Sequence, residues 1–408
     1  MIYNLMRMLL APVIYISMLL GGKKGEFLKK RLKEDFSSLE GEDYIWVHCS
    51  SVGEINLSET LIKKLLSKRD ENILLTMFTD TGIEVARNKF KKEDRVKIYY
   101  FPLDSREKIR EILDRVKISF LILVETEIWP NLINEVSRVA KVILVNGRIS
   151  DRSFGRYKKL KGFLKSIFRN IDAFYMQTAH DSERIISLGA DKEKVETLGN
   201  IKFDIEFQRY TKEEQEAFKT FLGVAGRKVF TAGSSRTGEY ETLLEVYSKL
   251  SDTLLILVPR HIEKTPMIEE MLRNTSYKFK KYSEINEKNI EKTDIIIVDA
   301  IGILRKIYSI TDIAFVGGTL VNIGGHSLLE PLFYGKTPIF GPYLQNVKEI
   351  SQDILKYGIG YKVKNTQEFL DAVKSVEENQ ENSSDLIKKL FDENRDTADK
   401  IIDKIEKM

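Results

Sequence analysis

Short, continuous apolar segments that alternate with helix-like stretches constrain the fold of this chain more than any other feature. Most of these segments are apolar at every position, whereas a strand with one face in water alternates apolar and polar residues. Continuous apolar strands are typical of parallel sheets that helices cover on both faces. A first series of such segments occupies residues 44–50, 73–79, 97–103, 120–126, 141–146, 173–177 and 195–198. A second series follows at residues 228–232, 253–258, 294–299, 313–316, 337–340 and 360–363.

The two series predict two doubly wound, Rossmann-like α/β domains. A chain of 408 residues is long enough for two or three domains. Helix-like stretches such as residues 58–67 separate the strands, and residues 366–408 carry two helical patterns rich in Glu and Lys. We therefore predict an N-terminal domain at residues 23–205 and a C-terminal domain at residues 206–408. Ligands of such folds bind at the carboxyl ends of the strands, so we expect these ends to face each other across a cleft.

Composition and the absence of certain motifs further restrict the class of protein to which this chain can belong. Hydrophobic residues make up 42% and charged residues 31%, as in ordinary folded domains. A net charge of +4 is too dilute to predict a nucleic-acid binder. One cysteine, Cys49, and four dispersed histidines argue against disulfides and a Cys- or His-based metal site. No Gly-x-Gly-x-x-Gly follows a strand, which disfavours a dinucleotide. We expect a reduced, intracellular protein that uses neither a metal nor a cofactor.

The N-terminus is the one segment that does not resemble a soluble domain. Residues 8–22 contain no charge, and these 15 residues are followed by a lysine- and arginine-rich stretch at 23–33. A bilayer span needs roughly 20 apolar residues, so the segment is short for one. A signal peptide and a buried helix are alternatives, although no small-residue cleavage site follows. We expect residues 1–22 to form a membrane anchor or an interfacial helix on the cytoplasmic side.

Glu54 follows the first predicted strand, in the sequence Ser51-Val52-Gly53-Glu54 that opens a helical pattern. It therefore lies in the first turn of a helix at the carboxyl end of a strand. Ser51 and Glu54 fit a capping box, which is a purely structural role. The alternative is a general base whose carboxylate faces the cleft.

Two further carboxylates, Glu125 and Glu127, end the very apolar strand at residues 120–124. Carboxylates in such a place are costly unless they are paired or solvated in a cleft. Side chains alternate along a strand, so we expect only one of the two to point toward a given face. A structural role for either one alone remains open.

Two cations, Lys202 and Arg260, lie just beyond the ends of predicted strands. A cation in this position can hold a phosphate or a carboxylate, and Arg can do so with two parallel hydrogen bonds. Most single surface cations are simply solvated, and that alternative applies to both.

The most specific stretch is a glycine-rich segment at residues 315–331. Its strand ends in Gly317-Gly318, and a loop with Gly324-Gly325-His326 leads to Ser327, which we expect to cap a helix. Glycines let a ligand approach backbone N–H groups, and a helix N-terminus favours a phosphate. Glu330 would repel a phosphate, so we expect it to accept hydrogen bonds from sugar hydroxyls. A merely structural turn is the alternative.

Taken together, these motifs resemble the 3-deoxy-D-manno-octulosonic acid (Kdo) transferases, glycosyltransferase family 30, which have the GT-B fold. The resemblance covers nearly the whole chain and rests on six features in the family's order. They are an N-terminal anchor and the motifs at residues 51–54, 125–132, 202–204, 257–261 and 315–330. Where the family often has Met-Gly-Glu and Asn-Pro-Leu-Glu, this chain has Ile301-Gly302-Ile303 and Ser327-Leu328-Leu329-Glu330.

The resemblance implies transfer of Kdo from CMP-Kdo to the lipid A precursor, with inversion, at the cytoplasmic face of a bacterial inner membrane. It implies that Glu54 is the general base and that Glu125 and Lys202 stabilise the transition state. It also implies a CMP-sugar site made by Pro259, Arg260, Ile301, Gly302, Ile303, Gly324, Gly325, Ser327, Leu328, Leu329 and Glu330.

Two other functions remain open at this stage. One is a different GT-B transferase or a nucleotide-sugar epimerase, which would usually bind a UDP-sugar. The other is a peripheral membrane scaffold without catalysis, although a scaffold has no need of carboxylates and cations at strand ends.

Overall fold

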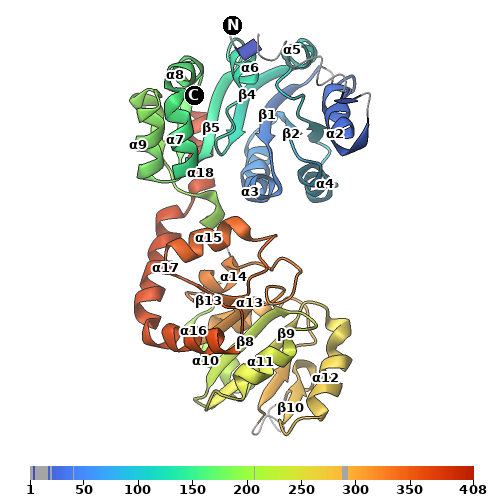
Figure 1. The fold of residues 1–408 in the computed structure, drawn as a ribbon, viewed down its shortest axis with the longest axis vertical. Helices are drawn as coiled ribbons and strands as arrows, with labels where there is room; N and C mark the ends of the chain where they lie inside the picture. The colour runs from blue at the N-terminus through green and yellow to red at the C-terminus, as the bar shows by residue number, and fades with distance from the viewer. Residues whose placement is uncertain (1–2, 5–16, 19–20, 40, 206, 287–292) are drawn as a thin grey trace. The chain divides into compact units, whose positions relative to one another are not determined.

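The computed structural model describes residues 3–4, 17–18, 21–39, 41–205, 207–286 and 293–408. The chain forms two compact units (Figure 1). The first contains the residues up to Asp204 together with Asn394–Met408, and the second contains Ile205–Glu393. Each unit is built on its own parallel sheet, which confirms the predicted pair of Rossmann-like α/β domains.

The first unit holds a seven-stranded parallel sheet in the order β3-β2-β1-β4-β5-β6-β7. Its strands are β1 (Asp43–Cys49), β2 (Asn72–Met77), β3 (Val96–Tyr100), β4 (Lys117–Val124), β5 (Lys141–Gly147), β6 (Ala173–Met176) and β7 (Val195–Thr197). Helices α2 to α9 and α18 cover it. They are α2 (Gly22–Leu32), α3 (Val52–Lys68), α4 (Asp80–Lys89), α5 (Arg106–Arg115), α6 (Pro130–Val136), α7 (Asp151–Lys159), α8 (Lys161–Phe168), α9 (Ala179–Ser187) and α18 (Thr397–Glu406).

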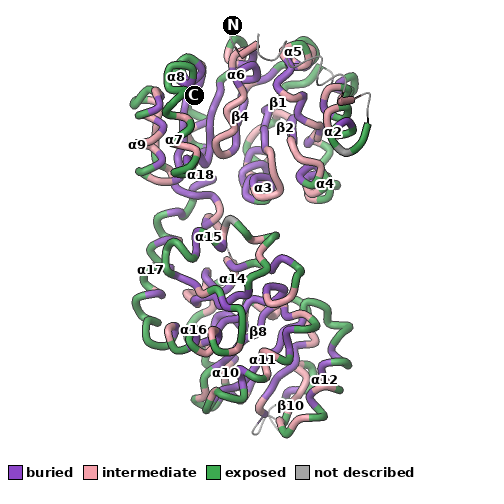
Figure 2. The backbone as a smooth tube through the Cα atoms, in the orientation of Figure 1, coloured by how far each residue is buried: buried purple, intermediate pink, exposed green. Residues whose placement is uncertain are grey.

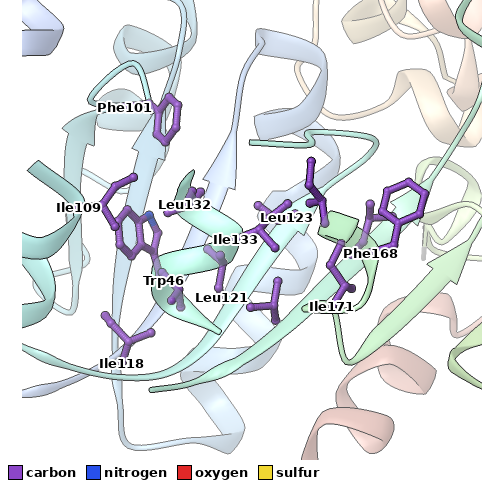
Figure 3. Close-up of a cluster of buried hydrophobic side chains, with 14 of the residues drawn as sticks. Trp46, Phe101, Ile109, Ile118, Leu121, Leu123, Leu132, Ile133, Phe168 and Ile171 are labelled. Carbon is purple, nitrogen blue, oxygen red and sulfur yellow. The ribbon is translucent and has the colours of Figure 1, made fainter. Parts of the chain in front are cut away.

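Both faces of this sheet are buried, as the continuous apolar segments predict (Figure 2). Trp46 of β1 packs on one face, in a cluster with Leu121 and Leu123 of β4 (Figure 3). Ile45 and Val47, its neighbours in β1, pack in a separate cluster on the opposite face. Alternate residues thus serve two cores, which is why the sequence shows no polar alternation.

The second unit holds another seven-stranded parallel sheet, in the order β10-β11-β9-β8-β12-β13-β14. Its strands are β8 (Lys228–Ser235), β9 (Thr253–Pro259), β10 (Phe279–Lys281), β11 (Ile295–Ile297), β12 (Ile313–Val316), β13 (Pro338–Phe340) and β14 (Tyr361–Lys362). Its helices are α10 (Lys212–Phe221), α11 (Tyr240–Tyr247), α12 (Thr265–Arg273), α13 (Leu304–Ile310), α14 (Leu329–Phe333), α15 (Lys348–Lys356), α16 (Thr366–Glu378) and α17 (Gln380–Asn394). Sequence patterns miss β10, because this edge strand has three partly exposed residues and no apolar run.

Each sheet has a point where the direction of winding reverses. In the first unit it lies between β1 and β4, which are neighbours in the sheet but not in the chain. In the second unit it lies between β8 and β12. Crevices outside the carboxyl ends of strands at such points are the usual ligand sites of doubly wound folds.

The predicted membrane anchor at residues 1–22 lies largely outside the described residues, which include only 3–4, 17–18 and 21–22 of it. Within the described parts of the chain, no helix combines the length and the apolar character that crossing a bilayer requires.

The C-terminal residues correct the predicted domain organisation. We predict one domain at residues 206–408 with two terminal helices, whereas the residues from 366 onward form three helices, α16, α17 and α18. Helix α18 belongs to the first unit, because Ile401, Ile402 and Ile405 are buried in the core between α18 and the sheet. Asp204 fixes its start by accepting hydrogen bonds from the N–H of Ala398 (2.8 Å) and of Asp396 (3.0 Å).

Ile402→Ala is expected to destabilise the first unit by about 2–5 kcal/mol, because Ile402 is fully buried and a cavity would replace it. Urea unfolding followed by the fluorescence of Trp46 and Trp129, which both lie in this unit, measures the change. Lys400→Ala on the exposed face of α18 is the matched control and should leave the midpoint nearly unchanged. An unaltered midpoint for Ile402→Ala would contradict the place of α18 in this core.

Candidate active site

Glu54 lies where the sequence predicts, in the first turn of α3 at the carboxyl end of β1. Ser51 is the N-cap of α3, and its hydroxyl accepts a hydrogen bond from the Glu54 N–H at 3.3 Å. Glu54 as a whole residue is 6% exposed, and its carboxyl accepts from the Ser50 N–H (2.5 Å) and the Ser51 hydroxyl (3.0 Å). Ser51 therefore caps α3, but the predicted capping box is incomplete, because the Glu54 carboxyl accepts from the N–H of Ser50 and not from that of Ser51.

The charge state of Glu54 differs from that of an ordinary carboxyl. Burial raises the pKa of Glu54 to about 9, and the neighbouring carboxylates Glu127 and Glu125 add to the effect. Glu54 is therefore mostly protonated at neutral pH when the site holds no ligand. Pairs of carboxyls with opposed protonation states are characteristic of acid–base sites.

Glu127 shows the opposite behaviour. Burial alone would raise its pKa, but His48, Ser50 and Trp129 together hold the pKa of Glu127 below its usual value. Trp129 Nε1 donates to Glu127 Oε2 at 2.8 Å, and Ser50 Oγ donates to the same oxygen. Glu127 thus stays ionised beside the protonated Glu54.

Glu125 pairs with Lys202 instead. Lys202 Nζ lies 3.7 Å from Glu125 Oε1, and both side chains are largely shielded from solvent. Lys202 sits in a short 3-10 turn at Ile201–Phe203, which Asn200 caps by accepting the Lys202 N–H at 3.0 Å.

One expectation for this cluster is wrong. We expected Glu125 and Glu127 to point toward opposite faces, yet both carboxylates lie near enough to Glu54 to raise its pKa. The expectation misapplied the strand rule, because residues two apart, such as Glu125 and Glu127, lie on the same face of a strand. In addition, β4 ends at Val124 and Glu125 adopts a left-handed backbone with φ of 60°, so neither residue is part of the strand.

These groups define a carboxylate site: Glu54, Glu125, Glu127 and Lys202. Glu54 follows β1, and Glu125 and Glu127 follow β4, so the site lies at the winding reversal of the first sheet. The structure thus brings together Glu54, Glu125 and Lys202, the three residues for which the resemblance implies a catalytic role.

In the second unit, cations gather at the other winding reversal. Arg260 directly follows β9, and Arg236 directly follows β8. Arg236 Nε donates to His326 Nε2 at 3.2 Å. Burial and the charges of Arg236, Arg260 and His261 lower the pKa of His326 to about 4, so this imidazole is neutral and can accept that bond.

A cavity of about 290 Å³ opens beside these cations. Its lining comes from the carboxyl end of β8, the start of α11, the segment after β9 and the loop after β12: Ser235, Arg236, Thr237, Tyr240, His261, Glu263, Lys264 and Ile323. Cations and hydroxyls at this edge suit a phosphorylated ligand.

The glycine-rich loop is built differently from the expectation. Its backbone N–H groups were expected to receive a phosphate, but buried Glu239 already accepts from those of Gly318 (2.9 Å), Thr319 (3.0 Å) and Leu320 (3.0 Å). The Gly325 N–H donates to the Gly318 carbonyl at 2.7 Å. The glycines serve close packing, since a Cβ on Gly318 would meet the His326 ring at 3.1 Å.

Two further expectations concern the helix after this loop. Ser327 does not cap it, because α14 begins at Leu329 with Leu328 as its N-cap and no side-chain cap bond. Glu330, which we expect to accept hydrogen bonds from sugar hydroxyls, lies in the first turn of α14, and its Oε1 is 3.2 Å from Nε of Arg305. Its contact with a sugar stays a prediction. Arg305 in turn stacks over the ring of Phe207 at 3.9 Å.

The remaining predicted donor-site residues lie at the same edge of the second sheet. Pro259 ends β9, and Ile301-Gly302-Ile303 links β11 to α13. Ile301 is 87% exposed, and Gly302 adopts a positive φ of 86°. Gly324 and Gly325 also have positive φ.

Several residues of these two sites have no role predicted from the sequence. His48 lies one residue before the end of β1, Ser50 directly follows β1 and Arg236 directly follows β8, so a place at the carboxyl end of a central strand is the signal that could have identified them. The contact of Glu239 with the glycine-rich loop could not be predicted from the sequence, because acidic residues are common near the start of a helix.

Comparisons with known proteins add independent findings. The family model described as 3-deoxy-D-manno-octulosonic-acid transferase (kdotransferase) matches residues 27–205. The chain is 31% identical to the 3-deoxy-D-manno-octulosonic acid transferase of Haemophilus influenzae, over 98% of this chain and 96% of that protein. It is 52% identical to a Fusobacterium nucleatum protein named "Bifunctional glycosyltransferase/methyltransferase", over 98% of this chain. The match spans only 63% of that longer relative. A solved C-terminal CMP-Kdo binding domain of WaaA from Acinetobacter baumannii is 22% identical, with a TM-score of 0.40 over 44% of this chain and 96% of that one.

The chain has two doubly wound units with polar groups near their winding reversals, and it matches a transferase over nearly its full length. Together these findings identify a glycosyltransferase. The chain belongs to the 3-deoxy-D-manno-octulosonic acid transferase family.

Proposed function

We propose that this chain transfers Kdo from CMP-Kdo to the lipid A precursor lipid IVA, with inversion at the anomeric carbon, in the synthesis of the lipopolysaccharide core. The observation that carries the proposal is the carboxylate site at the winding reversal of the first sheet, in a member of this family. As part of the proposal, the carboxyl edge of the first sheet binds the acceptor and that of the second sheet binds the donor. We further propose that these two edges face each other across a cleft.

In the proposed mechanism, Glu54 takes the proton of the acceptor hydroxyl as that oxygen attacks the anomeric carbon. An alcohol is a poor nucleophile at neutral pH, so a positioned base speeds its attack. A carboxylate of raised pKa is a strong base once it is ionised, and the ionised fraction of Glu54 grows with pH. The rate should therefore rise toward alkaline pH.

The other groups act on the charges of the transition state. The anomeric carbon gains positive charge as its bond to the CMP phosphate breaks, and Glu125 can stabilise that charge. Lys202 holds Glu125 in place through their ion pair. The phosphate of the departing CMP takes the electron pair, and Arg236 and Arg260 can compensate its negative charge.

A nucleotide assay tests the donor assignment. Incubation with CMP-Kdo and a tetraacylated lipid A precursor should release CMP, added CMP should inhibit the reaction, and added UDP should not. Inhibition by UDP instead of CMP would point to a UDP-sugar enzyme. No CMP release at all would revive the scaffold hypothesis.

The proposed acceptor carries fatty acyl chains and stays in the bilayer, so we also propose that the protein docks on the cytoplasmic side of the inner membrane. Deleting residues 1–22 is expected to weaken its association with liposomes that contain anionic lipid, because the segment joins an apolar run to a basic flank. Flotation of the full chain and of the deletion variant measures this. Equal flotation of both would count against an anchoring role.

A further inference from the structure

Ser50 joins the two carboxyls of opposite charge state. Its backbone N–H donates to Glu54 Oε2 at 2.5 Å, and its hydroxyl donates to Glu127 Oε2. The orientation of the Glu54 carboxyl is therefore tied to the place of Glu127 through one residue.

Three fully buried side chains, Trp46, Thr76 and His48, form a series of contacts that ends at Glu127. Trp46 Nε1 donates to Thr76 Oγ1 at 2.9 Å, and Thr76 Oγ1 lies 3.0 Å from His48 Nδ1. His48 Nε2 lies 3.8 Å from Glu127 Oε2. None of Trp46, Thr76 and His48 is exposed to solvent.

Hydrogen-bond accounting fixes the proton of His48. An indole N–H can only donate, so the Thr76 oxygen accepts from Trp46. The Thr76 hydroxyl then satisfies its own hydrogen by donating to His48 Nδ1, which places the imidazole proton on Nε2. Within the described residues His48 Nε2 makes no hydrogen bond of its own, so its proton gains only the ionic contact with the Glu127 carboxylate at 3.8 Å. The opposite tautomer would lose that contact, would turn the Nε2 lone pair toward the carboxylate and would leave the buried hydroxyl hydrogen of Thr76 unsatisfied. The protonated nitrogen of His48 therefore faces the Glu127 carboxylate.

We propose that Glu127 is a positioning residue for Glu54, acting through Ser50 and held from the buried side by His48 in its Nε2–H tautomer. Glu127 touches neither substrate in this proposal, which rests on the proposed role of Glu54 as the base.

The electrostatics agree with this geometry. His48 on β1 and Trp129, the residue before α6, lower the pKa of Glu127. In addition to burial, the negative charge of Glu127 in turn raises the pKa of Glu54 on α3, of Cys49 on β1 and of Tyr157 on α7. Glu54 also feels Glu125. The negative charge of Glu127 is the larger of the two carboxylate effects that raise the pKa of Glu54.

Glu127→Gln tests the proposal through the pH profile of kcat/KM. Removing the negative charge lowers the pKa of Glu54, so the rising limb should move to lower pH by about one unit or more. The KM for CMP-Kdo should stay within about twofold, because the change does not touch the donor. An unmoved limb would overturn the inference, since a merely structural loss lowers activity equally at every pH. Glu59→Gln is the matched control, because this partly exposed carboxylate of α3 pairs with Lys63 and Lys89 and not with the carboxylate site.

Thr76→Val provides a second variant that keeps every charge of the site. It removes the hydroxyl that fixes the His48 tautomer, so kcat should fall while the KM for CMP-Kdo holds, and Thr76→Ser should restore kcat. Failure of Thr76→Ser to restore kcat, or full activity of Thr76→Val, would contradict the tautomer argument. An active Glu54→Gln would instead overturn the proposed function itself, so the two failures are distinguishable.

Discussion

Glu54→Gln is expected to lower turnover by about 10²–10⁴-fold, the usual contribution of a general base. Gln keeps the size of the side chain and one acceptor for the Ser50 N–H, but it cannot take a proton. CMP release from CMP-Kdo in the presence of the lipid acceptor measures the loss. CMP binding, measured by calorimetry, should stay close to that of the wild type. Glu59→Gln on the same helix should remain fully active, and near-normal turnover of Glu54→Gln would remove Glu54 from its role.

The same substitution should stabilise the protein, and the gain should grow with pH. The pKa of Glu54 is about 9 in the folded chain against an ordinary 4.5. A group whose pKa is raised by folding stabilises the folded chain fully at pH values below its pKa in the unfolded chain. This stabilisation is lost as the pH rises toward its pKa in the folded chain. Gln does not titrate, so the melting temperature of the variant should exceed that of the wild type by more at pH 8 than at pH 5. A difference that does not change between these pH values would contradict the buried, protonated state.

Lys202→Met is expected to have the second largest effect, a loss of turnover of about 10²–10³-fold. The substitution takes the paired cation from Glu125 and leaves a carboxylate in a largely buried place. Breaking such a pair also destabilises the fold, by about 3 kcal/mol or less at this partial burial. Kinetics and thermal unfolding measure the two effects separately.

A double variant separates stability from catalysis at this pair. Lys202→Met combined with Glu125→Gln removes both charges, so unfolding should return toward the wild-type temperature while turnover stays low. Lys68→Met at the exposed end of α3 serves as the control for the loss of a lysine. Recovery of turnover in the double variant would show that the pair is structural only.

Much of the architecture can be read from the sequence. The apolar segments give both sheets, because strands buried on two faces leave no polar positions in them. Glu54, Glu125 and Lys202 could be placed at one edge for the same reason: the carboxyl ends of parallel strands meet there. Edge strand β10 could not be found, since it has too few buried residues to leave a pattern.

Other features depend on contacts between distant parts of the chain, which local patterns do not carry. The return of α18 to the first unit depends on Asp204, 194 positions before the N–H of Ala398 that it binds. The direction of the Glu125 side chain depends on a left-handed backbone immediately after β4. The glycine-rich loop looks open in the sequence because nothing there reveals that Glu239, on a separate segment, occupies its N–H groups.

Mass spectrometry of the lipid product tests the central claim most directly. The wild type, incubated with CMP-Kdo and tetraacylated lipid A precursor, should yield the precursor extended by one or more Kdo residues, and Glu54→Gln should leave the precursor unchanged. Unmodified lipid in both reactions, or equal extension in both, would contradict the account.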